Sequence, residues 1–166
     1  MEKDPEVRIA DVIDLDEVME LTLSCHNENG FVPANPRKIL DDLYPALTRY
    51  GGIVGMIGGR SKPLEGCVVL RIGQVSYSDV DVLEEKFLFV HKDYRAASVG
   101  RARLLAEFTK LAADLLGKPL IIGVLSNHRT KAKVRLYERV FGEPAGAFFL
   151  YNARTDSNLS PATKET

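Results

Sequence analysis

Tryptophan is absent from the 166 residues, and cysteine occurs only twice. Cys25 and Cys67 show no CxxC or other spacing of metal ligands, so we expect two buried thiols and neither a metal site nor a disulfide framework. No run approaches eighteen apolar residues, which argues against a membrane span, and the acids in MEKDPEVRIA are unlike a secretory signal. These absences predict a cytoplasmic protein without a membrane partner.

Two phosphate-binding signatures are also missing. The sequence contains neither GxxxxGK(S/T) nor GxGxxG, so ordinary nucleotide hydrolysis and hydride transfer lose support. With 45% hydrophobic and 27% charged residues, the composition is that of a globular protein. We expect one domain over residues 1–152 and a disordered tail over 153–166, where Ser, Thr and Pro are frequent.

The net charge of −1 conceals an uneven distribution. Residues 91–139 hold 11 Lys and Arg against 4 Asp and Glu, which leaves 11 basic and 19 acidic residues in the rest of the chain. This split suggests an anionic ligand on one side and a cationic substrate on the other, unless surface charge simply clusters there. Nucleic-acid binding would use the same charge. The basic region has no interleaved aromatics and no known reader motif, however, so we expect no nucleic acid partner.

Apolar periodicity and turn residues predict six strands and four helices. The predicted strands span 7–10, 51–59, 64–73, 84–90, 119–125 and 145–152. A capping box from Asp14 to Glu17 starts the first predicted helix, and a loop over 27–38 separates it from the second. The third follows the strand at 84–90, and Ser126 or Asn127 is expected to cap the fourth.

Residues 90–100 have the layout of an anion site. A strand ends there, the turn KDYRAAS follows, and a helix starts near Ser98, whose hydroxyl could cap it. Backbone N–H groups in a first helical turn are unpaired, and the helix dipole adds about half a positive charge. Gly100 would let a ligand approach the backbone, and Arg95 and Arg101 could pair with phosphate oxygens. Taken alone, the pattern is also that of an ordinary capped helix with solvated arginines.

The stretch VHKDYRAASVGRARLL resembles the GNAT superfamily of acyl-CoA N-acyltransferases, in which a Val-x-Pro-x-Tyr-Arg type sequence leads into Arg/Gln-x-x-Gly-x-Gly/Ala. Ser98 stands where the first of the paired glycines is usual, and Lys92 stands where proline is common. A second stretch, LSNHRTKAKVRLYERVFG at 125–142, is similar to the family's segment from strand 5 to helix 4. Both motifs occur in the family's order, and the resemblance covers roughly residues 7–152. The matching positions of the first motif are Val90, Tyr94, Arg95 and Gly100.

The resemblance implies an α/β (α+β) fold with a mixed, mostly antiparallel central sheet of about six to seven strands flanked by about four helices. In that family strands 4 and 5 splay to admit acetyl-CoA, and amides at the helix start hold the coenzyme A pyrophosphate. It also implies that Asn127 contacts the pantetheine arm or the segment beside it. The cofactor-binding residues expected on this basis are Phe89, Val90, Arg95, Ala96, Ala97, Ser98, Val99, Gly100, Arg101, Asn127 and Lys133.

Transfer of an acyl group to an amine requires a base that takes a proton from the amine and an acid that protonates the leaving thiolate. The resemblance assigns the acid to Tyr137, near the thioester sulfur, and the alternative is a core tyrosine on the apolar face of its helix. Counting back from Arg95, the resemblance places the base at Glu84 or Glu85, unless a water chain serves instead. Adjacent strand residues face opposite sides, so only one of the two can reach the site, and a bulge would switch which one.

These motifs predict transfer of an acetyl group from acetyl-CoA to a primary amine of a small-molecule or peptide acceptor, directly within a ternary complex. The alternative is a non-catalytic acyl-CoA-binding or partner-binding domain that retains the fold. Glu28, Asp79 and Asp81 could attract an amine, and solvated loop acids explain them equally well. The acceptor, the acyl chain and the oligomeric state stay open, with a homodimer as one alternative.

Overall fold

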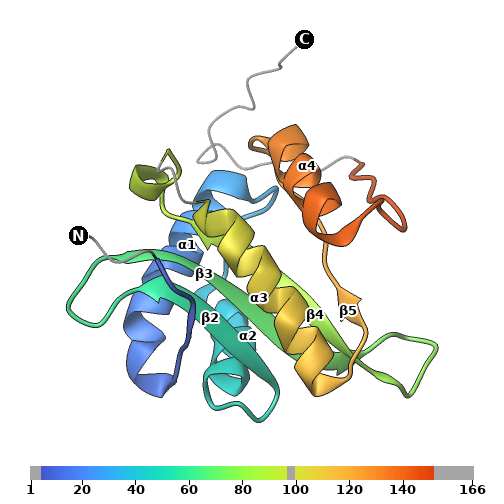
Figure 1. Cartoon of the computed structure of the whole chain (residues 1–166), viewed down its shortest axis with the longest axis horizontal. Coiled ribbons are helices and arrows are strands. Elements are labelled where there is room, and N and C mark those ends of the chain that lie inside the picture. Colours follow the sequence, from blue (N-terminus) through green and yellow to red (C-terminus); the bar gives the residue numbers. More distant parts are fainter. Residues whose placement is uncertain (1–4, 97–99, 152–166) are drawn as a thin grey trace.

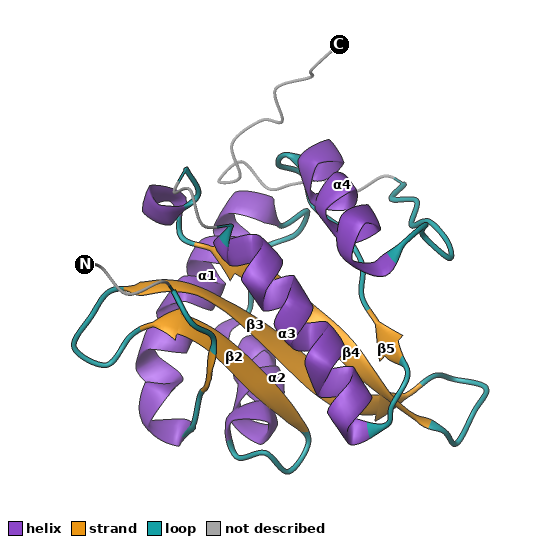
Figure 2. Ribbon diagram, viewed as in Figure 1, coloured by secondary structure: helices purple, strands orange, loops and turns teal. Residues whose placement is uncertain are grey.

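The computed structural model describes residues 5–96 and 100–151, and its centre is a five-stranded sheet with the order β1-β2-β3-β4-β5 (Figure 2). Neighbouring strands from β1 to β4 run antiparallel, whereas β5 runs parallel to β4. Only two residues of β5 pair with β4, so a short strand lies beside a long one. The strands are β1 (Arg8–Ile9), β2 (Gly52–Gly58), β3 (Leu64–Gln74), β4 (Asp81–Val90) and β5 (Leu120–Ile121).

The described residues also form four α-helices that accompany this sheet (Figure 1). They are α1 (Leu15–Asn29), α2 (Pro36–Leu47), α3 (Arg101–Leu116) and α4 (Thr130–Phe141), with short 3-10 turns η1 (Val12–Asp14) and η2 (Lys92–Tyr94). The first two helices pack on one face of the sheet, α3 packs on the other, and α4 lies beside α3. Within the described ranges no helix is long and apolar enough to cross a membrane.

Alternation along β3 divides the core into two layers. Cys67 and Val69 pack with α1 and α2, whereas Val68 and Leu70 pack with α3. Side chains of a strand alternate between faces, so a strand covered on both sides has a continuous apolar sequence, as LEGCVVL largely does. All four side chains are fully buried. Cys25 is buried as well, which confirms the prediction of two buried thiols.

The predicted order of strands and helices is confirmed as far as α4, but six to seven strands are more than the described residues form. Residues 145–151 form no strand, although AGAFFLY is rich in strand-forming side chains. Phe149 and Tyr151 are 93% and 95% exposed. A strand needs a partner with a free edge, and β5 offers only two residues. The strand predicted over 119–125 shortens to that pair because the chain leaves β4 after Ile121.

Two predicted helix caps are also wrong. The side chain of Asp14 makes no capping bond to α1, and instead completes a capping box with Asp11 around η1. Arg129, in a left-handed conformation, precedes α4, so neither Ser126 nor Asn127 caps that helix. The side chains of both residues bond to the end of α1 instead. Asp14 thus caps a turn just before the predicted one, whereas Ser126 and Asn127 bond to residues nearly a hundred positions away.

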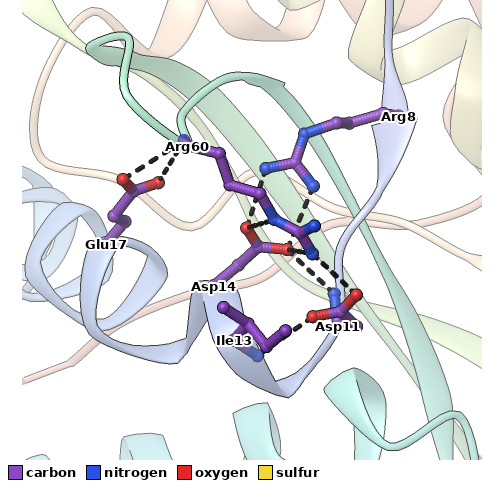
Figure 3. A network of polar contacts seen from close by, with 6 residues as sticks. All are labelled: Arg8, Asp11, Ile13, Asp14, Glu17 and Arg60. Atoms are coloured by element: carbon purple, nitrogen blue, oxygen red, sulfur yellow. Dashed lines mark hydrogen bonds and ion pairs between the residues drawn. The ribbon is translucent and has the colours of Figure 1, made fainter.

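A polar network around Asp14 ties the start of the chain to the turn between β2 and β3 (Figure 3). Asp14 is 1% exposed, and its carboxylate accepts hydrogen bonds from Arg8 at 3.0 and 2.8 Å and from Arg60 Nε at 2.9 Å. Arg60 also pairs with Asp11 at 2.6 Å, and its backbone N–H donates to Glu17. The hydrogen bonds from Arg8 hold the pKa of Asp14 well below its usual range. Asp14 therefore stays ionised inside the fold.

Strand β4 contains a bulge at Lys86 that changes which side chains face which helices. Val69 pairs with Phe87 and Leu70 pairs with Glu85, so Lys86 has no partner on β3. Paired residues share a face, so Phe87 lies with Val69 toward α1 and α2, and Glu85 lies with Leu70 toward α3. Strict alternation would have placed Glu85 and Phe87 on one face. The bulge therefore turns Glu85 to the side of α3 and α4.

Candidate active site

A cleft of about 530 Å³ lies beside the edge of β4, where β5 departs from it. Its walls are β4, the segment from β5 into α4, the last turns of α1 and the start of α3. Its polar lining includes Glu85, Tyr137 and Lys133, together with the two arginines Arg95 and Arg101. Residues from the two motif-bearing stretches of the sequence therefore meet in one cleft.

A carboxylate and a phenol are in direct contact in this cleft. The Tyr137 hydroxyl donates a hydrogen bond to Glu85 Oε2 over 2.9 Å. Burial raises the pKa of Glu85 to about 7, against the lowering effects of that bond, of a backbone bond from Gly123 and of the Lys133 ammonium. Burial and the Glu85 carboxylate raise the pKa of Tyr137, so the phenol keeps its proton at neutral pH. The pair joins a group that can accept a proton near neutrality to a group that carries one.

Glu84 lies on the other face of β4. Its register partner on β3 is Arg71, whose guanidinium bonds to backbone oxygens near α2, including Gly51 O at 2.9 Å. The Glu84 side chain is 45% exposed, borders the cleft and pairs with Lys86 Nζ at 2.8 Å. Of the two glutamates predicted as alternatives, only Glu85 contacts Tyr137.

Arg95 is fixed by contacts on three sides. Its Nε donates to Val90 O at 2.9 Å, its two terminal nitrogens engage Glu28 at 2.7 and 2.8 Å, and its guanidinium carbon lies 5.0 Å from the centre of the Phe89 ring. Burial alone would raise the pKa of Glu28, but the hydrogen bond from Arg95 brings it below its ordinary value. Phe89 and Val90, both predicted to bind cofactor, border the cleft and hold this arginine.

The start of α3 supplies a second cation and an open stretch of backbone. Arg101 forms an ion pair with Glu65, and its guanidinium carbon lies 5.3 Å from the centre of the Tyr94 ring. Gly100 precedes the helix with φ −69°, and a Cβ there would make only an ordinary contact with Arg103, at 3.6 Å. The protein's own packing therefore does not require glycine at this position, and space remains beside the backbone for a ligand.

Other predicted site residues lie away from these contacts. Ala96 is exposed and is not among the residues that line the cleft. Asp79 and Asp81 lie around the turn between β3 and β4, where the Gln74 amide donates to both. The predicted helix cap at Ser98 falls on a residue whose placement is not described. Three expected cofactor contacts lie outside the described residues in this way: Ala97, Ser98 and Val99.

The segment before α4 is tied to the end of α1. Asn127 Nδ2 donates to Gly30 O at 2.7 Å, and Lys133 Nζ donates to Asn29 Oδ1 at 2.5 Å and to Ser126 Oγ at 2.7 Å. Asn127 and Lys133 were both predicted to bind cofactor, and here their side-chain nitrogens donate to other groups of the protein. Sequence reasoning missed Asn29, because its side-chain partners Ser126 and Lys133 lie 97 and 104 residues away.

The donor set of the cleft fits acetyl-CoA. Two guanidinium groups and the open backbone at Gly100 suit phosphate, and the carboxylate–phenol pair suits proton exchange at a reacting centre. Both guanidinium groups already hold carboxylates of the protein, from Glu28 and Glu65. A phosphate bound there would share Arg95 and Arg101 with these acids or displace them.

No protein-family model matches this sequence, and no curated protein matches it either.

Solved structures match along most of the chain. AAC(6′)-Iy, in complex with the bisubstrate analogue CoA-S-monomethyl-acetylneamine, aligns with a TM-score of 0.66 and 16% identity over 92% of this chain and 99% of its own. The aminoglycoside 6′-N-acetyltransferase AAC(6′)-Ih from Acinetobacter baumannii aligns with a TM-score of 0.62 and 10% identity, over 90% and 98%. The ribosomal-protein-alanine N-acetyltransferase from Brucella melitensis aligns with a TM-score of 0.59 and 14% identity, over 88% and 98%.

Identities of 10% to 16% relate these chains by their fold. The arrangement agrees with the one that the sequence resemblance implied, namely a mixed sheet with four helices, although with five strands among the described residues. The chain therefore has the fold of the GNAT acetyltransferases.

Proposed function

We propose that this protein transfers an acetyl group from acetyl-CoA to a primary amine, with both substrates bound at the same time. The observation that carries the proposal is the hydrogen bond of 2.9 Å between Tyr137 and Glu85 in the cleft beside β4. Acyl transfer to an amine needs a base and an acid, and this pair supplies both. The solved neighbours, which include N-acetyltransferases of aminoglycosides and of a ribosomal-protein alanine, support an amine acceptor.

Acetyl-CoA supplies an activated acyl group and a thiolate leaving group. Arg95, Arg101 and the backbone at Gly100 would hold its phosphate end, because these groups gather cationic and N–H donors at the start of α3. Phe89 and Val90 of β4 would line its path toward Tyr137. Contacts of acetyl-CoA with Asn127, with Lys133 and with residues 96–99 stay predictions from the sequence resemblance.

Glu85 and Tyr137 move one proton in total. Glu85 accepts a proton from the attacking nitrogen as the C–N bond forms, since its pKa of about 7 makes it a stronger base than an ordinary carboxylate. Tyr137 gives its hydroxyl proton to the departing sulfur as the C–S bond breaks. Neutral Glu85 no longer raises the pKa of the phenol, and its proton passes to the tyrosinate through the bond that they share. Both residues thereby return to their starting states.

Thiol release from acetyl-CoA, measured across a panel of primary amines, tests this function. The panel includes aminoglycosides, polyamines and peptides with N-terminal alanine. We expect turnover with at least one amine, and a kcat about 10²- to 10⁴-fold lower in Tyr137→Phe with an acetyl-CoA Kd within about twofold of wild type. Tyr44→Phe is the matched control, because Tyr44 is exposed on α2, and it should keep wild-type turnover.

Wild-type turnover in Tyr137→Phe would remove the phenol from proton transfer. Calorimetric titration with acetyl-CoA separates the remaining alternatives. Binding without transfer to any amine would indicate a non-catalytic acyl-CoA-binding domain. No binding at millimolar acetyl-CoA would exclude both functions.

A further inference from the structure

Helix α4 carries Tyr137, yet none of its residues is fully buried. It packs beside α3, where Lys110 Nζ donates to Val140 O over 3.4 Å. Within the described ranges, its side chains also reach β4 through the bond from Tyr137 to Glu85 and α1 through the bond from Lys133 to Asn29, and Lys133 bonds to Ser126 ahead of the helix. These hydrogen bonds therefore contribute to the position of the phenol.

The densest of these contacts is a bridge formed by Asn29, Ser126 and Lys133. Lys133 Nζ lies 2.5 Å from Asn29 Oδ1 and 2.7 Å from Ser126 Oγ, and Ser126 Oγ lies 3.0 Å from the same Asn29 oxygen. Asn29 is 8% exposed, and its Nδ2 donates to Cys25 O over 3.1 Å. Both polar atoms of the Asn29 side chain are engaged, so the bridge selects one orientation of the amide.

This bridge joins elements from opposite faces of the sheet. Asn29 is the last residue of α1, which packs with α2 on one face of the sheet. Lys133 belongs to α4, which lies beside α3 on the other side (Figure 1). Among the described residues, the ladder between β4 and β5 consists of the pairs at Leu120 and Ile121. The backbone N–H of Asn127 adds a hydrogen bond of 3.1 Å to Asn29 O. The bridge therefore connects the two faces of the sheet beside the edge where the β4–β5 ladder stops.

Lys133 and Tyr137 are four residues apart on α4 and so share one side of the helix. Burial lowers the pKa of Lys133, and its ammonium in turn lowers the pKa of Glu85. Cys25 also borders the cleft, but burial raises the pKa of its thiol to about 11, so it is neutral. Lys133 is thus a cation that acts on Glu85 and stands one helical turn before Tyr137.

We propose that Asn29 is a positioning residue. Together with Ser126 it anchors Lys133 and thereby the start of α4, and this keeps the Tyr137 hydroxyl, one turn further along the helix, in contact with Glu85. The catalytic consequence rests on the proposed function, whereas the anchoring does not.

Hydrogen exchange in the full chain tests the anchoring without any substrate. We expect Asn29→Ala and Lys133→Met to speed amide exchange over 130–141 about tenfold and to leave exchange in α3 unchanged, as loss of a hydrogen bond to a charged group predicts. Lys131→Met is the matched control, since it removes the same charge from an exposed position on α4 and should leave exchange unchanged. Lys133→Met keeps the test decisive if Asn29→Ala does not fold. Unchanged exchange over α4 in folded Lys133→Met would overturn the proposal.

Turnover tests the catalytic consequence through a double-mutant cycle. Lys133→Met should lower kcat about tenfold without raising KM for the amine, and should move the acid limb of the pH profile upward because the ammonium no longer lowers the pKa of Glu85. At a pH above the acid limb of both profiles, the same substitution in a Tyr137→Phe background should change kcat by less than about twofold. Additive losses would contradict positioning through the phenol. Faster α4 exchange in a chain that acetylates no amine would support the anchoring and refute the proposed function.

Discussion

Asp14 and Glu85 are both shielded carboxylates, but they differ in what surrounds them. Two guanidinium groups, from Arg8 and Arg60, meet Asp14 and hold its pKa well below the usual range (Figure 3). A phenol and a backbone N–H meet Glu85, and burial raises its pKa to about 7. The ammonium of Lys133 also lowers the pKa of Glu85.

The difference separates a carboxylate that stays ionised in the fold from one that can take up a proton near neutral pH. A carboxylate whose charge is matched by arginines stays ionised and serves the fold. A carboxylate that loses hydration on burial and gains few compensating partners has a pKa near neutral pH, so it can exchange protons there. The chemical identity of the side chain does not decide between these outcomes, because the partners do.

Removing the carboxylate of Asp14 should have the largest effect on the fold. Asp14→Ala removes the buried acid from Arg8 and Arg60, so we expect the free energy of unfolding to fall by about 2–3 kcal/mol in urea denaturation. Asp16→Ala, at an exposed position two residues later, should cost less than about 1 kcal/mol. Equal losses in the two variants would show that the network contributes little.

Removing the charge of Glu85 should mainly affect turnover. Glu85→Gln keeps the shape of the side chain but cannot accept a proton from an amine, so we expect kcat to fall about 10²- to 10³-fold. The free energy of unfolding should stay equal or increase, because a costly buried charge is gone. Thiol-release assays and urea denaturation on the same samples measure both quantities. Wild-type turnover in this variant would favour a water chain as the base.

The two carboxylates should give stability opposite dependences on pH. The pKa of Asp14 is lowered by folding, so its contribution is complete above its ordinary value of 3.8 and is lost as the pH falls below it. The pKa of Glu85 is raised from 4.5 to about 7, so its contribution is present below pH 4.5 and is lost as the pH rises to about 7. The loss amounts to about 3 kcal/mol.

Urea denaturation at a series of pH values measures this second dependence. Glu85→Gln should abolish a fall in the free energy of unfolding between pH 4.5 and 7, whereas Asp14→Ala should retain it. Parallel curves for wild type and Glu85→Gln in this window would show that folding does not raise the pKa of Glu85.

The smallest effect is expected at Glu84, the neighbour of Glu85. Its side chain is 45% exposed and pairs with Lys86 on the other face of β4. Glu84→Gln should therefore change the free energy of unfolding by less than about 0.5 kcal/mol and kcat by less than about twofold. A loss of turnover comparable to that of Glu85→Gln would contradict the assignment of the base to Glu85.

Periodicity in the sequence predicted the fold where an element's own residues determine it. The apolar runs of β2, β3 and β4 specify strands, and the four helices follow in the predicted order. Residues 145–151 have a comparable strand propensity but form no strand. Strand formation requires a free edge, and the length of that edge depends on where β5 leaves β4, which packing of distant elements determines.

Distant packing also limited what the sequence alone could predict about the candidate site. The resemblance pointed to Tyr137 as the acid and left Glu84 and Glu85 as alternatives for the base, since alternation cannot show where a bulge falls. The bulge at Lys86 brings Glu85 to Tyr137 and leaves Glu84 on the other face of β4. Asn29 was missed because its partners come from a segment nearly a hundred residues later, and nothing local distinguishes it from an ordinary residue at the end of a helix.

The bulge also determines how β4 would tolerate a change in its length. The ladder with β3 is continuous from Asp81 to Glu85 and again from Phe87 to Val90, so Lys86 is in effect one inserted residue within a regular strand. A deletion of Lys86 would close the ladder and keep Glu85 opposite Leu70, on the face of α3 and α4. Descendants of this chain could therefore gain or lose that residue and retain the same carboxylate in the cleft.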